Sequence, residues 1–261
     1  MVDTQIREFA DRLYRAEKDL TVIPPLTNEV SDMAMDLAYE IQLLNVEKKR
    51  GQGDRVVGHK IGLTSKPMQT MLGVNEPDFG HLFASMHYQS GDVVDYPLIQ
   101  PRVEPELAFV LQADLDGAQI GVQDVLQATR FVLPAVEIID SRIADWKIKL
   151  ADTIADNASS GCFVLSDTVT AIDQANLTTA GAILKKNGEI VETGAGAAVI
   201  GNPARAVAWL ANKLSSLGTT LKKGDIILSG AVSRAVNVQA GDRVSLSFGP
   251  LGRVEFTMQA N

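Results

Sequence analysis

The chain has 261 residues, of which 46% are hydrophobic and 21% charged, enough to bury a core as one large domain or two small ones. Its formal net charge of −8 leaves no basic stripe for phosphates, which argues against nucleic acid as a partner. No apolar run approaches the roughly 18 residues of a membrane span, and the N-terminus resembles neither a secretory signal nor a transit peptide. A single cysteine, Cys162, excludes an intrachain disulfide and a cysteine-based metal cluster, so we expect a cytoplasmic protein.

The first 55 residues are predicted to form a helical segment. Apolar residues in the first helix recur at helical spacing: Ile6, Phe9, Ala10 and Leu13. A second helix is expected to start at an N-cap on Ser31 and to close on a basic last turn followed by Gly51. These helices would pack on the outside of the remaining domain.

Residues 56–261 are predicted to form a β-rich domain, compact with the helical segment. Short strand-like runs are separated by glycine turns at 56–63, 91–99, 105–111, 131–139, 162–167, 181–192, 224–230, 242–248 and 252–258. Two helices are expected among them, at 121–130 and at 202–218, where Asn202 precedes a first-turn proline. This order predicts an α+β fold with a closed or folded-over mixed sheet.

Two acidic residues interrupt the strand predicted around residue 105. Side chains alternate along a strand, so Glu104 and Glu106 share one face with Ala108 and Val110. Adjacent carboxylates repel one another, and a divalent cation with oxygen ligands would relieve that repulsion. The alternative is a pair of exposed glutamates on an edge strand, which Pro105 favours because proline is common at sheet edges.

A third carboxylate, Glu137, lies in the apolar run FVLPAVEII. Burying such a group is costly unless it is paired or binds a metal. With Glu104 and Glu106 it could supply three oxygen ligands of the kind that Mg²⁺ or Mn²⁺ prefers. The competing interpretation is a core glutamate in a salt bridge.

Lys60 alternates onto the same face as Gly58 and Gly62 in the run VVGHKIGL. Glycine weakens a strand unless something must approach the backbone closely, so Lys60 is a candidate for binding an anionic substrate or the carboxylates. The alternative is an edge lysine that discourages aggregation. His59 alternates away from Lys60, and the three histidines of the chain lack metal-type spacing.

Asp78 is expected in a proline–glycine loop, as a general base or, more ordinarily, as a turn-stabilising aspartate. The stretch DTIADNASSG offers hydrogen-bonding groups that include Ser159, but it also fits a capped loop. No P-loop, dinucleotide fingerprint or nucleophile-elbow motif is present in the sequence.

Five motifs together resemble the fumarylacetoacetate hydrolase superfamily, from about residue 40 to the C-terminus: VVGHKIGLTS, LGVNEPDFGHLF, QPRVEPELAFVL, VLPAVEIIDSRIADWKIKLADTIADNASSG and KKGDIILSGAVSRAVNVQAGDRVSLSF. Within it they look like the bacterial 2-hydroxypenta-2,4-dienoate (2-oxopent-4-enoate) hydratases of aromatic meta-cleavage and steroid degradation. The first forty residues match only in helical character.

The resemblance implies a mixed β-roll with peripheral helices, assembled into pentamer-based homo-oligomers such as decamers. It assigns Mg²⁺ or Mn²⁺ to Glu104, Glu106 and Glu137, places Lys60 and Asp78 in the catalytic pocket, and puts Ser159 near a small anionic 2-hydroxydienoate. The implied reaction adds water to 2-hydroxypenta-2,4-dienoate, or a C5-substituted analogue, to give 4-hydroxy-2-oxopentanoate.

Two alternatives stay open within this resemblance. A 2-oxo-3-hexenedioate (4-oxalocrotonate) decarboxylase would share the fold, the metal site and much of the sequence. A non-catalytic partner subunit of such an enzyme is the second alternative, although the complete set of Lys60, Asp78 and three glutamates argues against it. A hydratase for the longer 2-oxohept-4-ene-1,7-dioate is disfavoured because the longer loop expected between Arg142 and Asp152 is absent.

Overall fold

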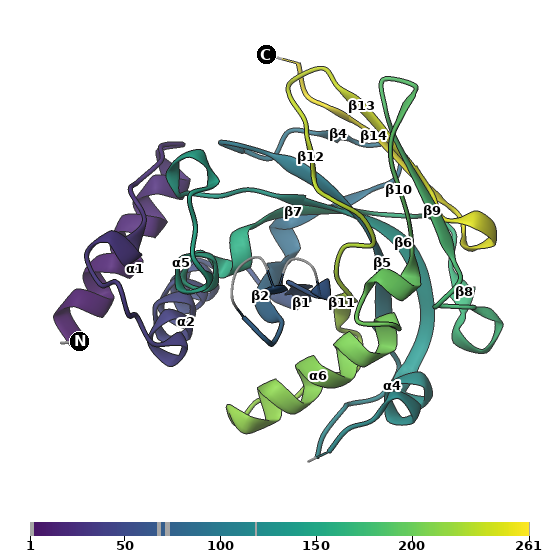
Figure 1. The fold of residues 1–261 in the computed structure, drawn as a ribbon, viewed down its shortest axis with the longest axis horizontal. Coiled ribbons are helices and arrows are strands. Elements are labelled where there is room, and N and C mark those ends of the chain that lie inside the picture. Colours follow the sequence, from purple (N-terminus) through teal and green to yellow (C-terminus); the bar gives the residue numbers. More distant parts are fainter. Residues whose placement is uncertain (1–2, 67–68, 71–73, 118, 261) are drawn as a thin grey trace.

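The computed structural model describes residues 3–66, 69–70, 74–117 and 119–260, and within them it shows an α+β, β-rich fold. The helices are α1 (Asp3–Lys18), α2 (Met35–Gly51), α4 (Val122–Ala128), α5 (Leu150–Ala155) and α6 (Pro203–Ser216). Figure 1 shows α1, α2 and α5 grouped on one side of the large sheet, with α4 and α6 lying together elsewhere on it. The predicted fold class is therefore confirmed.

The large sheet has nine strands in the order β2-β1-β11-β5-β6-β7-β3, with β12 paired to β5 and β8 to β6. Its strands are β1 (Val56–Gly62), β2 (Asp78–Phe83), β3 (His87–Gln89), β5 (Arg102–Leu111), β6 (Thr129–Ile139), β7 (Ser160–Leu165), β8 (Thr170–Ala171), β11 (Ile226–Leu228) and β12 (Val236–Asn237). The parallel pairing of β1 with β11 makes the sheet mixed. The strand β5 lies inside this sheet, between β11 and β6, and not at an edge.

The second sheet has five strands in the order β10-β9-β13-β14-β4. They are β4 (Val93–Val94), β9 (Gly181–Lys186), β10 (Glu189–Ala195), β13 (Arg243–Ser247) and β14 (Arg253–Met258). β13 and β14 pack on β6, and β14 also contacts β7. The two sheets therefore fold over a shared apolar core as a roll, as Figure 1 shows.

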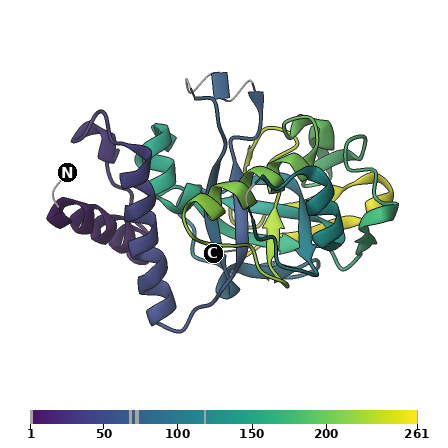
Figure 2. The ribbon, with the colours of Figure 1, turned by 90° about the horizontal axis from the view of Figure 1, so that it is seen from below.

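The N-terminal helices pack as a separate layer beside the sheets (Figure 2). The predicted stripe of α1 is buried: Ile6, Phe9, Ala10 and Leu13. Gln42 of α2 donates to the carbonyl of Phe79 at 3.1 Å and to that of Ile154 at 2.7 Å, which ties α2 to β2 and α5. The first strand begins at Val56, but the division into segments 1–55 and 56–261 stays a prediction.

The predicted start of the second helix was wrong, whereas its predicted end is confirmed by a basic last turn that closes at Gly51. Its N-cap is Ala34, because backbone turns from Leu26 to Met33 occupy the preceding segment and leave Ser31 no helix end to cap. Gly51 is the last helical residue, and Gly53, at φ +92°, makes the turn that follows. By contrast, α4 and α6 lie where predicted, and the Asn202 side chain accepts a hydrogen bond from the amide of Ala204 at 2.9 Å.

Two further segments differ from the sequence-based expectation. Residues 152–161, for which a capped loop was one of two interpretations, contain the end of α5, a short 3-10 turn at Asn157–Ser159 and the start of β7. The motif LGVNEPDFGHLF begins at Leu72 and Gly73, which lie outside the described residues, and ends in the strand β2. Among the described residues, no helix is both long and apolar enough to cross a membrane.

Candidate active site

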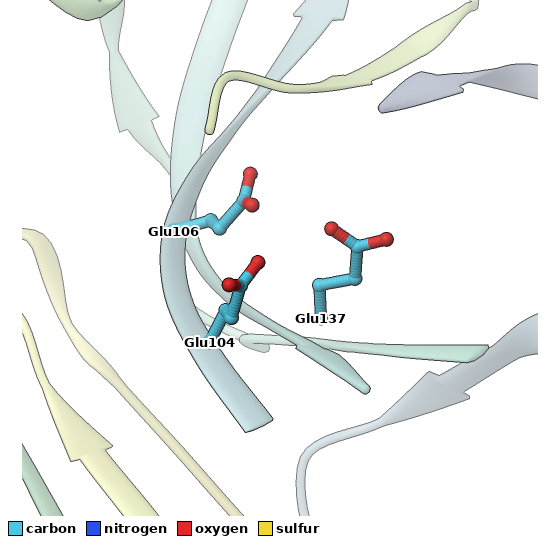
Figure 3. Close-up of side chains that lie close together, drawn as sticks. All are labelled: Glu104, Glu106 and Glu137. Carbon is cyan, nitrogen blue, oxygen red and sulfur yellow. The ribbon is translucent and has the colours of Figure 1, made fainter. Parts of the chain in front are cut away.

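Three carboxylates converge on the inner face of β5 and β6. Glu104 lies directly opposite Glu137 in the antiparallel pairing of these strands, and Glu106 follows two residues later on the same face. Each offers a carboxylate oxygen that lies within 4.8 Å of the other two. Figure 3 shows all three side chains pointing into one space from two neighbouring strands. The strand pairing therefore brings together the three residues selected from the sequence.

None of these carboxylates is exposed, which excludes the alternative of exposed edge glutamates. Glu106 and Glu137 are both 0% exposed, and Glu104 is half-buried. Burial raises the pKa of Glu104 to about 7, with further upward contributions from the charges of Glu137 and Asp78. Burial also raises the pKa of Glu106 and of Glu137, and the mutual repulsion of Glu106 with its two neighbours adds to the shift. The cluster is electrostatically unfavourable without additional positive charge.

The hydrogen bonds of the cluster leave oxygens available to a cation. Glu106 Oε2 accepts from the amide of Gly230 at 2.7 Å, and Glu137 Oε1 lies 3.4 Å from the hydroxyl of Ser160. Glu106 Oε1 and Glu137 Oε2 are buried without a hydrogen-bond partner among the described residues. Buried unpaired carboxylate oxygens facing one another fit a hard divalent cation, which takes oxygen ligands.

Lys60 provides the nearest positive charge. Its side chain is buried, and Nζ lies 3.3 Å from Glu137 Oε1 and donates to the carbonyl of Ala158 at 2.9 Å. Burial acts to lower the pKa of Lys60, but the charges of Glu137, Asp78 and the other carboxylates outweigh it and raise the pKa. Lys60 is therefore a buried ammonium group, and not an edge lysine.

Asp78 lies beside Lys60, but in a strand and not in the predicted loop. It is the first residue of β2, opposite Gly62 of β1, because the ladder between these strands overrides the local turn signal of proline and glycine. Its Oδ1 is buried without a partner among the described residues, and burial raises its pKa. A side chain at position 62 would meet Asp78 Oδ1 at 2.1 Å, which explains the glycine there.

The hydroxyl of Ser159 lies 3.0 Å from that of Thr153. Ser160, the next residue, is the serine whose hydroxyl approaches Glu137. Both belong to the turn and strand that follow α5, where the carbonyl of Ala158 meets Lys60. The structure thus brings Ser160 to Glu137, and the contact of Ser159 with substrate stays a prediction.

Three contributions to the pocket were not singled out from the sequence. The amide of Gly230 donates to Glu106. Position 230 requires glycine, because its φ is +107° and an added Cβ would lie 2.2 Å from the hydroxyl of Thr64. The carbonyl of Ala158 binds Lys60. Arg102, two residues before Glu104 on the same face, lies over the ring of Trp146 at 4.3 Å from its centroid.

The histidines lie away from the carboxylates. His59 and His81 face each other on the opposite side of β1 and β2 from Lys60, with ring centroids 4.9 Å apart. His87 stacks on Phe163. The prediction that His59 points away from Lys60 is confirmed, and His59 is packed in the core.

The family model described as fumarylacetoacetate (FAA) hydrolase C-terminal matches residues 47–259. The chain belongs to the fumarylacetoacetate hydrolase family. This match includes every residue of the cluster together with Lys60, Asp78 and the segment from Asn157 to Ser160.

Two curated members of this family are similar over nearly the whole chain. The 2-keto-4-pentenoate hydratase of Paraburkholderia xenovorans (strain LB400) is 45% identical over 262 residues, covering 100% of this chain and 97% of that protein. The 2-hydroxyhexa-2,4-dienoate hydratase of Comamonas testosteroni is 45% identical over 263 residues, covering 98% of this chain and 100% of that protein.

A solved structure in the family has nearly the same backbone. The 4-oxalocrotonate decarboxylase from Pseudomonas putida G7, complexed with magnesium and adipate, aligns with a TM-score of 0.96 at 36% identity. The alignment covers 99% of this chain and 98% of the decarboxylase. The predicted mixed β-roll of this family is therefore confirmed.

Proposed function

We propose that this protein is a divalent-metal-dependent hydratase that adds water to 2-hydroxypenta-2,4-dienoate or a C5-substituted analogue, giving 4-hydroxy-2-oxopentanoate or its homologue. The observation that carries the proposal is the convergence of Glu104, Glu106 and Glu137 beside Lys60 and Asp78. The full-length likeness to hydratases at 45% identity supports this reaction class.

Glu104, Glu106 and Glu137 would hold the cation through their carboxylate oxygens. Their donor set is all oxygen, which favours Mg²⁺ or Mn²⁺ over metals that prefer nitrogen or sulfur. When bound, such an ion supplies a Lewis acid that draws electron density from the 2-oxo end of the substrate. The cation and Lys60 also explain how a chain of net charge −8 accommodates an anionic substrate.

The reaction has two steps, and in each of them one proton is lost and one is gained. The dienol loses the proton of its 2-hydroxyl group and gains one at C5, which gives a 2-oxo-3-enoate whose C4 is electrophilic. Water then loses a proton as its oxygen bonds to C4, and C3 gains a proton. No oxidant and no co-reactant other than water is needed.

Lys60 and Asp78 are the groups for these transfers. Asp78 has a buried, unpartnered Oδ1, and burial raises its pKa, which makes it a stronger base than an exposed aspartate. Lys60 keeps its proton because carboxylates surround it, so its ammonium group suits donation and stabilisation of developing negative charge. The family resemblance implies that Ser159 contacts the substrate.

A second candidate is the decarboxylation of 2-oxo-3-hexenedioate. The decarboxylase structure matches the whole chain with a TM-score of 0.96, although its identity of 36% is below that of the hydratases. A non-catalytic subunit is disfavoured because buried, unpaired carboxylates are costly to keep without a use for them.

Product analysis separates these functions. The protein is incubated with Mg²⁺ and either 2-hydroxypenta-2,4-dienoate or 2-oxo-3-hexenedioate, and the products are weighed by mass spectrometry. Addition of one water to the first substrate supports the hydratase, and loss of CO₂ from the second supports the decarboxylase. No reaction with either would contradict both enzymatic assignments. A pentamer-based homo-oligomer and association with another enzyme of the pathway stay predictions from the resemblance, and a cytoplasmic location stays a prediction from the sequence.

A further inference from the structure

The segment Asn157–Ser159 has a conformation that L-residues rarely adopt. Its three residues have φ values of +54°, +51° and +53°, in the left-handed region, and none is glycine. The side chain of each such residue crowds its own backbone, so a run of three persists only when its surroundings hold it there. Something outside the segment must therefore fix it.

This segment contacts Lys60 directly, and it also contacts β2, the strand that begins with Asp78. The carbonyl of Ala158 accepts the hydrogen bond of Lys60 Nζ at 2.9 Å. The side chain of Asn157 pairs with the backbone of His81 in β2, accepting from its amide at 2.8 Å and donating to its carbonyl at 2.9 Å. The carbonyl of Asn157 also packs on Gly80, where an added Cβ would meet it at 2.3 Å. The segment thus joins β1 and β2 at the pocket.

A buried ion pair, Arg142 with Asp156, holds the segment at both ends. Arg142 Nε pairs with the Asp156 carboxylate, Nη2 donates to the carbonyl of Asp156 at 2.6 Å, and Nη1 donates to the carbonyl of Ser160 at 3.0 Å. The amide of Arg142 donates to Asp156 Oδ2 at 2.9 Å. Asp156 precedes the left-handed run and Ser160 follows it, so one planar guanidinium group spans the turn.

The pair is poorly explained as a contribution to stability alone. Arg142 is 4% exposed and Asp156 is 3% exposed, and removing two charges from water generally costs about as much as their attraction returns. Neither residue belongs to the group of three glutamates that could hold a metal. Their contacts converge on the turn whose middle carbonyl meets Lys60.

We propose that Arg142 and Asp156 are positioning residues, which hold the left-handed turn so that the Ala158 carbonyl fixes the ammonium group of Lys60 in the pocket. The inference rests on the proposed hydratase function for its kinetic readout. Arg142 is required as arginine because a lysine cannot reach the carbonyls on both sides of the turn with one fixed fork. Neither residue touches substrate in this account.

The first test measures kcat, KM and Mn²⁺ affinity for Asp156→Asn and Arg142→Lys, each below its own melting temperature. We expect kcat to fall by about 10- to 100-fold, as for a misplaced catalytic group, with KM and Mn²⁺ affinity nearly unchanged. Asp242→Asn is the matched control, since Asp242 is also a buried carboxylate, 5% exposed, with hydrogen bonds to Asn187 and the amide of Gln239. It lies by the five-stranded sheet, so its kcat should stay at the wild-type value.

A double-mutant cycle asks whether the effect passes through Lys60. If it does, Lys60→Met/Asp156→Asn should have the kcat of Lys60→Met within about twofold, because the two losses are not independent. Additive losses would overturn the proposal. An unchanged kcat in folded Asp156→Asn would also overturn it. So would a fall in kcat and Mn²⁺ affinity together with a rise in KM, because that pattern indicates disruption of the whole site.

A crystal structure provides a readout that needs no turnover. In Asp156→Asn the contact between Lys60 Nζ and the Ala158 carbonyl, 2.9 Å in the wild type, should be lost, and its retention would overturn the proposal. If Asp156→Asn does not fold, Arg142→Lys carries the same tests, because it keeps a cation beside Asp156. Absence of hydration by the wild type would count against the proposed function, whereas normal wild-type turnover with an unaffected variant would count against the positioning role only.

Discussion

The inner face of the five-stranded sheet carries Leu184, Leu246, Val254 and Phe256, whereas the inner face of β5 and β6 carries three glutamates. Both faces are buried, but β9 and β13 alternate buried with outward residues, whereas β5 is buried on both faces from Pro105 to Phe109. They differ in what the buried positions contribute. Apolar side chains there stabilise the fold, and buried carboxylates oppose it. Charged side chains at positions where apolar ones would stabilise the fold therefore indicate the site more clearly than the shape of the fold does.

The largest expected effect comes from Glu106→Gln in the carboxylate cluster. Hydration should fall by more than about a hundredfold, because even residues that only orient a metal ligand commonly contribute 10- to 100-fold. The free energy of unfolding of the metal-free protein should not decrease, since burial already disfavours the charged form of Glu106. Steady-state kinetics and denaturant unfolding after chelator treatment measure the two quantities. A large loss of metal-free stability would show that Glu106 is structural.

The opposite pattern is expected for Leu246→Ala in the five-stranded sheet. Leu246 is 0% exposed, and removing a buried leucine side chain typically costs about 2–5 kcal/mol. Thermal or urea unfolding should show this loss, while kcat per folded molecule stays close to wild type. A drop in kcat without a drop in stability would contradict the separation between the two sheets.

The pH dependence of stability tests the apolar side of β1 and β2, opposite Lys60. Burial lowers the pKa of His81 from 6.5 to about 4. Between these values the unfolded chain binds a proton that the folded chain does not, so the free energy of unfolding should fall as the pH falls, by up to about 3 kcal/mol for this residue. His59 acts in the same direction, since burial also lowers its pKa.

His81→Asn isolates that contribution. His81 Nδ1 lies 3.0 Å from Gln42 Oε1, and the amide of Gln42 donates elsewhere, so Nδ1 is the donor and asparagine can replace it. Urea unfolding from pH 7.5 to 4.5 should show a shallower decline for the variant than for the wild type. Equal slopes would contradict a neutral His81 in the folded protein.

The smallest effects are expected from substituting one glycine in each sheet, Gly62 in β1 and Gly181 in β9. Gly62→Ala should push Asp78 aside, since an added Cβ would lie 2.1 Å from its Oδ1, and reduce kcat by about tenfold with little change in stability. Gly181→Ala in β9 meets no atom within 4 Å and should change stability by less than about 0.5 kcal/mol. Kinetics and melting temperatures of both variants measure the difference. Equal activities would contradict the close packing of Asp78 on β1.

Strand alternation was sufficient to place Glu104 and Glu106 on one face, because that relation is local. Their meeting with Glu137 depends on the pairing of β5 with β6, which the residues alone do not determine and the family resemblance implied. Pro105 lies in a central strand and not at an edge. Its carbonyl accepts a hydrogen bond from the amide of Val232, in the loop before β12. The N–H and C=O of a strand residue point to the same side, so the missing N–H of Pro105 also faces this loop, and no hydrogen bond to β6 is lost.

Other parts of the site could not be predicted for identifiable reasons. Asp78 stands between Pro77 and Gly80, which locally favour a turn, and only the ladder with β1 makes this segment a strand. In the left-handed run Asn157–Ser159 only the asparagine is a residue type that visits this region, so the sequence does not indicate a run of three. The amide of Gly230 approaches Glu106 through tertiary packing, from 124 residues away in the chain.

Hydration by this protein should depend on one divalent cation held by the three carboxylates. Titration of Mn²⁺ into chelator-treated protein, by calorimetry with parallel turnover of 2-hydroxypenta-2,4-dienoate, measures this dependence. We expect one ion bound per chain, a rise in turnover that follows occupancy, and neither in Glu106→Gln. Full turnover in rigorously metal-free protein, or binding that persists unchanged in Glu106→Gln, would contradict it.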